Sequence, residues 1–377
     1  MNAPYSGKRI AIVYRTVSGL SGVPGVVLDH ARRLSELGHR VSLIGETFDR
    51  ERVARTGADS IRVRKLPLPK LWRLRWFMDR AGRLSRNFDF VVGHGHGMRQ
   101  HVFHLHNCIR LAYEKMHGQE PPPGDPVLLL QERMLRQAEF TLCIANSRLM
   151  QRELTARYGI PENRIRVVYP GSDLTRFNTG DGFRHREAVR RELGVGASTL
   201  VAGLITSGDF RKRGVDIAID GFAELPAALR RQTLLLIAGR ESRLEEYRRL
   251  AAARGLDGQI RFLPPTPQVE RYYHALDLYI HPARFEEFGL SVQEAMACGL
   301  PVIASRQVGA TELLPPAARD SLPVQLDAPE LAARLRHMIE DEKLRQQWRD
   351  FGLQAVANNS DAASFERVLA VYREAGL

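Results

Sequence analysis

The chain has 377 residues, 44% hydrophobic and 26% charged, a length that suggests about two domains of ordinary size. This composition excludes a disordered or fibrous chain, and no run approaches the roughly 18 apolar residues of a membrane span. The formal net charge of +12 lies in one half, because residues 1–175 hold 28 basic and 16 acidic residues whereas residues 176–377 hold 27 of each. The first half is therefore expected to meet an anionic partner.

The first half reads as short apolar strands alternating with helices. After the first strand comes a glycine-bearing loop, Gly19 to Gly25, and then an amphipathic helix that ends at Gly38, which together make a βαβ unit. The predicted strands are KRIAIVY (8–14), VSLIG (41–45), FDFVVG (88–93) and FTLCIAN (140–146).

The second half repeats this alternation, which is typical of parallel sheets with helices on both faces. We therefore expect an α/β fold of two doubly wound, Rossmann-like domains that face each other across a cleft. The polar segment 178–192 is the expected linker. The predicted strands are TLVAGLI (199–205), QTLLLIAG (232–239), QIRFLP (259–264), LDLYIHP (276–282) and LPVIAS (300–305).

The most informative stretch is HPARFEEFGLSVQEAMACGLPVIAS, residues 281–305. Gly289 precedes a predicted helix, and a helix start with free N–H groups suits a phosphate. Glu294 lies about one turn into this helix, where a carboxylate can accept hydrogen bonds from a ribose diol. Glu286, before the helix, is placed to reach the sugar side of a nucleotide. Two glutamates near a helix start are also common without any ligand. The surrounding residues must therefore distinguish a nucleotide site from an ordinary acidic helix start.

These surrounding residues resemble the signature of the retaining family 4 glycosyltransferases, which have the GT-B fold. The family pattern is E-G-F-G-x-x-x-x-E-A-M-A-x-G-x-P-V, and this sequence departs from it at Glu287, where Gly is usual. The resemblance implies that Glu294 binds the donor ribose and that Glu286 contacts the donor sugar. It is strong in the C-terminal half and weaker before residue 140.

Two further stretches agree with this resemblance. SGDFRKRGVDIAIDGF (207–222) is similar to the family's diphosphate-binding segment, which implies that Arg211 and Arg213 form the basic pair. Lys212 is the alternative if the loop register shifts. The turn at Gly22 resembles the family's G-G-V-E turn, which implies that its backbone approaches the donor phosphate. In related enzymes a histidine or an acidic residue at the corresponding strand end touches the donor sugar, and the resemblance implies His106, with Asn107 beside it, for this role.

The resemblance thus gives two sets of site residues. The catalytic set is Glu286, His106, Arg211 and Arg213. The donor-binding set is Gly22, Arg211, Arg213, Glu286, Phe288, Gly289, Leu290 and Glu294.

Five histidines lie within residues 94–106 and raise the alternative of a metal site. Strand alternation would place His104 and His106 on one face as a ligand pair. The enzymes resembled here generally work without a metal, because basic side chains and a helix dipole neutralise the diphosphate. No metal and no cofactor are therefore expected, and the nucleotide-sugar is a substrate.

The segment 62–87 carries nine basic residues against one acidic residue, Asp79, with Trp72 and Trp76 among them. Such a pattern suits an anionic membrane surface, and it equally suits a domain helix with an Arg-coated outer face. Nucleic-acid binding is disfavoured because no recognition fold accompanies the charge.

The resemblance implies a retaining, metal-independent hexosyltransferase that uses a nucleotide-sugar, UDP-glucose being the expected donor. Its acceptor is expected to be an anionic glycolipid of lipopolysaccharide biosynthesis. The expected location is cytoplasmic, as a bacterial peripheral protein at the inner face of the membrane. The alternatives are a GT-B nucleotide-sugar epimerase and a non-enzymatic membrane-surface or nucleic-acid-binding protein. The acceptor domain is expected at 1–177, with a helix at 360–377 crossing back, and the donor domain at 195–358.

Overall fold

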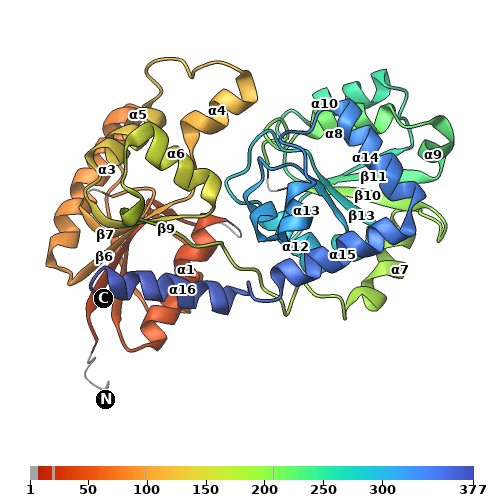
Figure 1. Cartoon of the computed structure of the whole chain (residues 1–377). Coiled ribbons are helices and arrows are strands. Elements are labelled where there is room, and N and C mark those ends of the chain that lie inside the picture. Colours follow the sequence, from red (N-terminus) through yellow and green to blue (C-terminus); the bar gives the residue numbers. More distant parts are fainter. Residues whose placement is uncertain (1–6, 19–21, 98, 207) are drawn as a thin grey trace. The chain divides into compact units, whose positions relative to one another are not determined.

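The computed structural model describes the chain except residues 1–6, 19–21, 98 and 207, and the side chains of 182–184. Its contacts divide the chain into two compact units, Met1–Val168 with Phe365–Leu377, and Tyr169–Ser364. Each unit has a parallel sheet with helices on both faces (Figure 1). The expected α/β fold class of two Rossmann-like domains is confirmed. Residues 169–177 and 360–364 belong to the second unit. The expected domain bounds had placed both segments in the first domain.

The N-terminal unit contains a seven-stranded sheet with the strand order β5-β3-β1-β6-β7-β8-β9. Its central strands are nearly continuous apolar runs because helices cover both faces. The strands of this sheet are β1 (Arg9–Val13), β3 (Arg40–Gly45), β5 (Asp59–Arg62), β6 (Phe90–His94), β7 (Gln100–Leu105), β8 (Phe140–Ala145) and β9 (Ile165–Val167). A two-stranded sheet is formed by β2 (Thr16–Val17) and β4 (Thr47–Phe48).

The helices of this unit pack apolar faces onto the sheet. Helix α1 (Val23–Glu36) buries Val27, Ala31 and Leu34, which recur at helical spacing. The C-terminal helix α16 (Asp361–Glu374), blue in Figure 1, adds Phe365, Val368, Leu369 and Tyr372 to the same core. The other helical segments are α2 (Arg50–Ala54), α3 (Lys70–Leu84), η1 (Ser85–Asn87), α4 (Ile109–His117), α5 (Pro126–Gln137), α6 (Arg148–Tyr158) and η2 (Glu162–Arg164).

The C-terminal unit contains a five-stranded sheet with the order β12-β11-β10-β13-β14. All five strands fall within the predicted apolar runs, namely β10 (Leu200–Ile205), β11 (Thr233–Ala238), β12 (Ile260–Leu263), β13 (Leu278–His281) and β14 (Val302–Ala304). The helical segments are α7 (Gly182–Glu192), α8 (Val215–Ala223), α9 (Ala227–Arg231), α10 (Leu244–Ala253), α11 (Glu270–Ala275), α12 (Leu290–Ala297), η3 (Gly309–Leu313), α13 (Pro316–Asp320), α14 (Ala328–Glu340) and α15 (Glu342–Val356).

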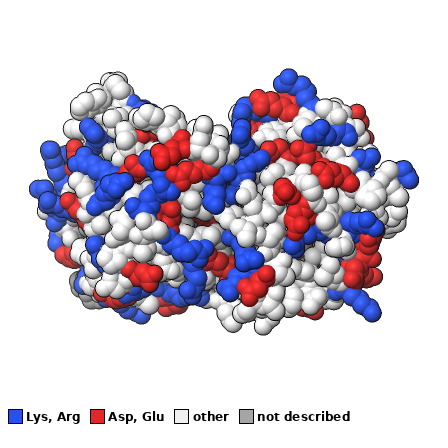
Figure 2. All heavy atoms as spheres, turned by 45° about the horizontal axis from the view of Figure 1, so that its top comes forward, with Lys and Arg blue, Asp and Glu red and all other residues white. Residues whose placement is uncertain are grey.

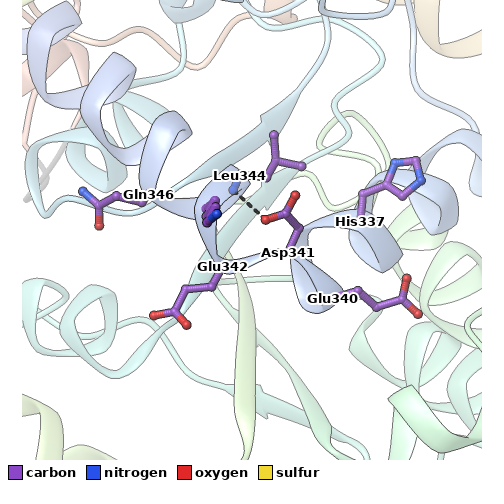
Figure 3. A pocket seen from close by; sticks show the side chains of 7 residues that line it. His337, Glu340, Asp341, Glu342, Leu344 and Gln346 are labelled. Atoms are coloured by element: carbon purple, nitrogen blue, oxygen red, sulfur yellow. Dashed lines mark hydrogen bonds between the residues drawn. The ribbon is translucent and has the colours of Figure 1, made fainter.

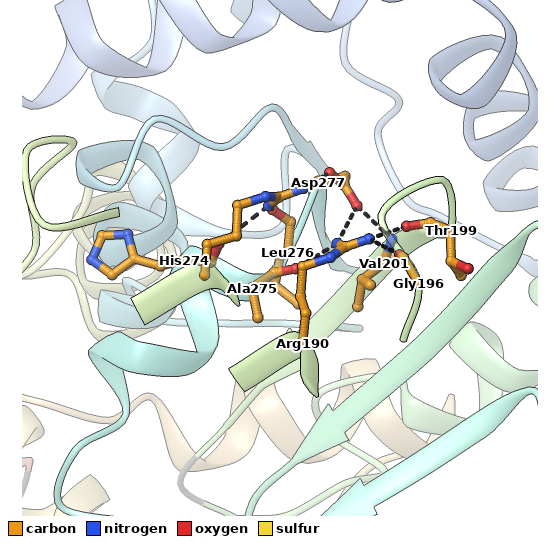
Figure 4. A network of polar contacts seen from close by, with 9 residues as sticks. Arg190, Gly196, Thr199, Val201, His274, Ala275, Leu276 and Asp277 are labelled. Atoms are coloured by element: carbon orange, nitrogen blue, oxygen red, sulfur yellow. Dashed lines mark hydrogen bonds and ion pairs between the residues drawn. The ribbon is translucent and has the colours of Figure 1, made fainter. Parts of the chain in front are cut away.

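The prediction of a linker at 178–192 was wrong, because helix α7 occupies most of it. Arg190 is 5% exposed, and its guanidinium donates to Asp277 Oδ2 at 3.1 Å and to the carbonyl of Ala275 at 3.1 Å (Figure 4). Asp277 also accepts the backbone N–H of Val201 at 2.7 Å. This buried network connects α7 to the starts of β10 and β13. The polar composition of 178–192 therefore reflects a buried ion-pair network and not a linker.

Candidate functional site

In the C-terminal unit the predicted donor residues follow two neighbouring strands. The strand order reverses at β10, which has β11 on one side and β13 on the other. Open α/β sheets bind ligands outside the carboxyl ends of their strands at such a switch point. Arg213 follows β10, and Glu286 follows β13. The fold thus brings these two predicted residues to one edge of the sheet.

Arg213 and Glu286 form an ion pair in which both side chains are largely buried, at 17% and 9% exposed. The Arg213 Nε also donates to Thr206 Oγ1 at 3.3 Å. His281, fully buried, places its Nε2 at 3.7 Å from Glu286 Oε2. Burial lowers the pKa of Arg213 and lowers the pKa of His281 to about 3, so this histidine is neutral at pH 7. The arrangement offers a guanidinium held in a fixed position.

The three basic residues of the loop before α8 lie in different surroundings. Lys212 Nζ donates to Glu287 Oε2 at 2.5 Å, with the Glu287 side chain buried and the Lys212 side chain largely so. Arg211 is exposed, and its backbone carbonyl accepts from Arg284 Nη1 at 2.7 Å. The predicted pair of Arg211 and Arg213 is therefore not brought together at the Glu286 ion pair. The unusual Glu287 has a structural explanation, because it neutralises the largely buried Lys212.

Two glycines hold the backbone of this site in conformations that other residues avoid. Gly214 has φ of +69°, and a Cβ there would lie 2.0 Å from the carbonyl oxygen of Pro282. Gly289 caps α12 with φ of +96°, and a Cβ there would lie 3.1 Å from Glu286 Cγ. Helix α12 begins at Leu290, one residue before the start that the sequence predicted, so its first N–H groups follow directly on Gly289. Phe288 is buried against the core.

Glu294 lies in the first turns of α12 and is held by a neighbouring tyrosine. The hydroxyl of Tyr273 donates to Glu294 Oε2 at 2.7 Å. Burial raises the pKa of Glu294 to about 6, and the hydrogen bond from Tyr273 lowers it by a smaller amount. The hydroxyl of Tyr273 thus fixes the position of the Glu294 carboxylate.

Sequence reasoning missed His281 and Tyr273, which touch the predicted glutamates. The signal for His281 was present, because it is the last residue of β13 and precedes a ligand-binding edge. Tyr273 could not be found in this way, because it reaches Glu294 from α11, 21 residues earlier.

The two site residues predicted in the N-terminal unit are both described. Gly22 is the N-cap of α1 with φ of +74°, which favours glycine, whereas residues 19–21 of its loop lie outside the described part. His106 follows β7, and its Nε2 lies 2.9 Å from His94 Nδ1. Burial lowers the pKa of His106 to about 3. His106 is therefore a neutral hydrogen-bonding group at pH 7.

The histidine-rich segment forms a buried cluster in the core of the N-terminal unit. In the described part of the chain, ring nitrogens of His30, His94 and His104 all lie within 4.8 Å of one another. His104 Nε2 is 2.8 Å from the hydroxyl of Tyr372, which already gives it a partner. The pair that the sequence suggested for a metal, His104 and His106, is stacked, with ring centroids 6.1 Å apart. His94 and His104 thus each have one ring nitrogen with a hydrogen-bond partner inside this core.

The basic segment 62–87 begins at the last residue of strand β5 and contains a loop, helix α3 and η1. Leu74, Phe77 and Met78 face the core, and Trp72 is 59% exposed. Trp76 is half-buried, and its Nε1 donates to the carbonyl of Arg64 at 3.0 Å. Figure 2 shows Lys and Arg side chains gathered on the visible face of the N-terminal unit. No helix in the described ranges is long and apolar enough to cross a membrane.

A separate hollow lies where α14 meets α15 in the C-terminal unit (Figure 3). Asp341 accepts the backbone N–H of Leu344 there at 3.0 Å, which caps α15. Its lining residues are His337, Glu340, Asp341, Glu342, Lys343, Leu344 and Gln346, and none of them is a predicted donor residue.

Known families match both units. Residues 20–176 match the family described as Glycosyltransferase Family 4, and residues 203–354 match the family described as Glycosyl transferases group 1. The chain therefore carries a family 4-type domain followed by a group 1 domain, and its fold is GT-B.

Two curated relatives are D-inositol 3-phosphate glycosyltransferases. The enzyme of Catenulispora acidiphila is 31% identical over 243 residues, which cover 62% of this chain and 57% of that protein. The enzyme of Thermobifida fusca is 31% identical over 289 residues, which cover 73% and 64%. The match thus spans less than two thirds of the length of these relatives.

Solved structures show the same fold at low sequence identity. WaaG, a glycosyltransferase involved in lipopolysaccharide biosynthesis, has a TM-score of 0.81 and 18% identity, with 96% of this chain and 99% of WaaG covered. Anabaena Alr3699/HepE in complex with UDP and glucose has a TM-score of 0.76 and 20% identity, with 97% and 100% covered.

Proposed function

We propose that the protein is a glycosyltransferase that moves a hexosyl group from a nucleotide-sugar, with retention, to a hydroxyl of an acceptor. The observation that carries the proposal is the arrangement at the carboxyl ends of β10 and β13. A buried guanidinium, the start of a glycine-capped helix and the carboxylate of Glu294 lie in one unit there. These groups match the diphosphate and the ribose diol of a sugar nucleotide.

In the proposed reaction the bond between the anomeric carbon and the diphosphate oxygen breaks, and a bond to the acceptor oxygen forms. The acceptor proton passes to an oxygen of the leaving diphosphate, so no protein base is required. Arg213 and the N–H groups that begin α12 stabilise the charge that grows on the leaving group. Because these groups are fixed before the reaction, the proposal requires no metal.

The proposed donor is a UDP-sugar, since Alr3699/HepE binds UDP and UDP-glucose on the same fold. For the acceptor, the relatives' names indicate an inositol phosphate and WaaG indicates lipopolysaccharide. Both are anionic polyols, which agrees with the basic first half. As the specific acceptor we propose a lipopolysaccharide-core glycolipid at the cytoplasmic face of the membrane.

The test is a donor and acceptor screen with the full chain. Thermal shift with UDP-, GDP- and ADP-sugars identifies the donor, and nucleotide release with D-inositol 3-phosphate or truncated lipopolysaccharide identifies the acceptor. Turnover in the presence of EDTA is expected. Loss of turnover that a single divalent ion restores would contradict the metal-independent mechanism.

Replacing Glu294 with Gln should weaken UDP-sugar binding about tenfold, because an ionised acceptor of a diol hydrogen bond becomes a neutral amide. The raised pKa of Glu294, about 6, also predicts that wild-type affinity falls as the pH drops below 6, where the carboxyl is protonated. Calorimetric titration at pH 5–8 measures both effects. Tyr273→Phe, which removes the hydrogen bond alone, is the matched control and should move the pH midpoint upward.

We further propose that the exposed side of α3 binds an anionic membrane surface. Each Lys or Arg near such a surface contributes about 1 kcal/mol, and salt screens this contribution. Changing Arg73, Arg75, Arg80 and Arg83 to Gln should abolish cosedimentation with vesicles that contain anionic lipid. Trp72→Phe should remove the blue shift of fluorescence on binding. Sedimentation of the fourfold variant equal to that of wild type would mean that α3 is only a solvated face.

A further inference from the structure

The N-terminal unit has its own switch point, separate from the one in the C-terminal unit that carries Arg213 and Glu286. Strand β1 lies between β3 and β6, and the order of the chain reverses there. Three polar residues follow these strands at their carboxyl ends, namely Arg15 after β1, Glu46 after β3 and His96 after β6. This is the edge at which a doubly wound sheet binds its ligand.

The backbone holds the first two of these side chains next to each other. The N–H of Glu46 donates to the carbonyl of Arg15 at 2.8 Å, and the N–H of Tyr14 donates to the carbonyl of Ile44 at 3.1 Å. Gly45 permits this approach, because a Cβ there would lie 2.7 Å from the carbonyl oxygen of Tyr14. As a result, Arg15 Nη1 lies 3.3 Å from Glu46 Oε2.

Among the described residues of this edge, three buried polar atoms have no hydrogen-bond partner, two in this pair and one in His96. In the described part of the chain, no hydrogen bond reaches Arg15 Nε, Glu46 Oε1 or His96 Nδ1. Glu46 is only 5% exposed. An unsatisfied buried polar group costs about 1–3 kcal/mol, so three such atoms at one sheet edge call for an external partner.

The chemistry of these atoms selects the partner. Arg15 Nε can only donate and Glu46 Oε1 can only accept, and a hydroxyl serves both. A phosphate would be repelled by the Glu46 carboxylate. Burial lowers the pKa of His96 to about 4, so the ring is neutral. The rings of Tyr14 and Phe77 pack around that of His96, with centroid distances of 5.5 and 6.1 Å, and hold it in place.

We propose that Arg15, Glu46 and His96 form a polyol-binding subsite that takes neighbouring hydroxyls of the acceptor's sugar or cyclitol ring. This inference rests on the proposed function, which identifies the ligand of the subsite as the acceptor of sugar transfer. The anionic substituent of such a ring would be held by other basic residues of this unit. The subsite thus explains recognition of the ring, whereas the net charge explains recognition of its phosphates.

Calorimetric titration of the full chain tests the subsite with four probes: D-inositol 3-phosphate, myo-inositol, methyl heptoside and inorganic phosphate. At least one polyol should bind, and phosphate alone should not compete with it. Glu46→Gln should weaken that binding at least tenfold, and Arg15→Lys, which keeps the charge but removes Nε–H, at least fivefold. Glu139→Gln, an exposed change in the same unit, is the matched control.

Thermal unfolding without a ligand separates binding from a structural role. If the residues form a ligand site, Arg15→Lys keeps the wild-type Tm while polyol affinity falls. Absence of polyol binding to the wild type, or equal affinity in both variants, would overturn the subsite. UDP-glucose titration of the same variants should stay unchanged, so failure of the subsite remains distinguishable from failure of the proposed donor function.

Discussion

Replacing Arg213 with Gln should lower kcat for sugar transfer by about 10²–10³-fold, the range measured when one fixed donor to a developing anion is removed. The reason is that Arg213 is held by Glu286 and Thr206 in a largely buried position, where its charge acts with little screening. Its effect should grow in the transition state, when the diphosphate gains charge. Initial rates of nucleotide release at saturating donor measure the change.

Three variants make this prediction specific. Arg213→Lys, which keeps a cation, should recover part of kcat. Arg211→Gln should have a much smaller effect, because Arg211 is exposed and lies outside the Glu286 ion pair. Arg231→Gln on α9 is an exposed control with no expected effect. Equal losses in the Arg211 and Arg213 variants would contradict the role that the structure gives to Arg213.

The strands of the C-terminal unit could be predicted because each is a short, continuous apolar run between helical patterns. Strands β5 and β9 could not, since DSIR and IRV carry charges and lie at the sheet edges, where burial imposes no apolar pattern. Helix α7 was missed for a related reason. Its Arg190 reads as a surface residue in the sequence, and only the distant Asp277 makes its burial stable.

The candidate site was predictable to the extent that it is local in sequence. Gly289, Leu290 and Glu294 belong to one helix start, so their spacing carried the information. The partner of each glutamate comes from another element, and the loop 211–213 gave no indication of which basic side chain turns inward. Arg15 and Glu46 were equally hidden, because 31 positions separate two residues that the parallel pairing of β1 and β3 brings together.

Acid should unfold the N-terminal unit before the C-terminal unit. Burial lowers the pKa of His30 to about 4 and those of His94 and His104 well below their usual value of 6.5. These rings are neutral in the folded chain and become protonated on unfolding below pH 6.5. The unfolded state therefore binds more protons, and stability falls as the pH drops from 6.5 towards 4.

The free energy of unfolding is expected to fall substantially in acid, although only a few side chains cause the change. Each pKa unit corresponds to about 1.4 kcal/mol, so His30 alone removes roughly 3 kcal/mol between pH 6.5 and 4. His96 and His106, with pKa values of about 4 and about 3, act in the same direction and in the same unit. The C-terminal unit has fewer such groups, namely His281, with a pKa of about 3, and His274, whose pKa burial also lowers. Its stability should therefore fall less as the pH drops.

The three tryptophans allow each unit to be followed separately. Trp348→Phe leaves Trp72 and Trp76 as probes of the N-terminal unit, and a variant with Phe at 72 and 76 leaves the buried Trp348 as the probe of the other. Urea unfolding of both variants at pH 7.5, 6 and 5 should show a steeper loss for the N-terminal probes. His94→Gln should make that loss shallower, whereas His117→Gln on the exposed end of α4 should not change it. Identical pH dependence at both probes would show that the buried histidine cluster does not govern acid stability.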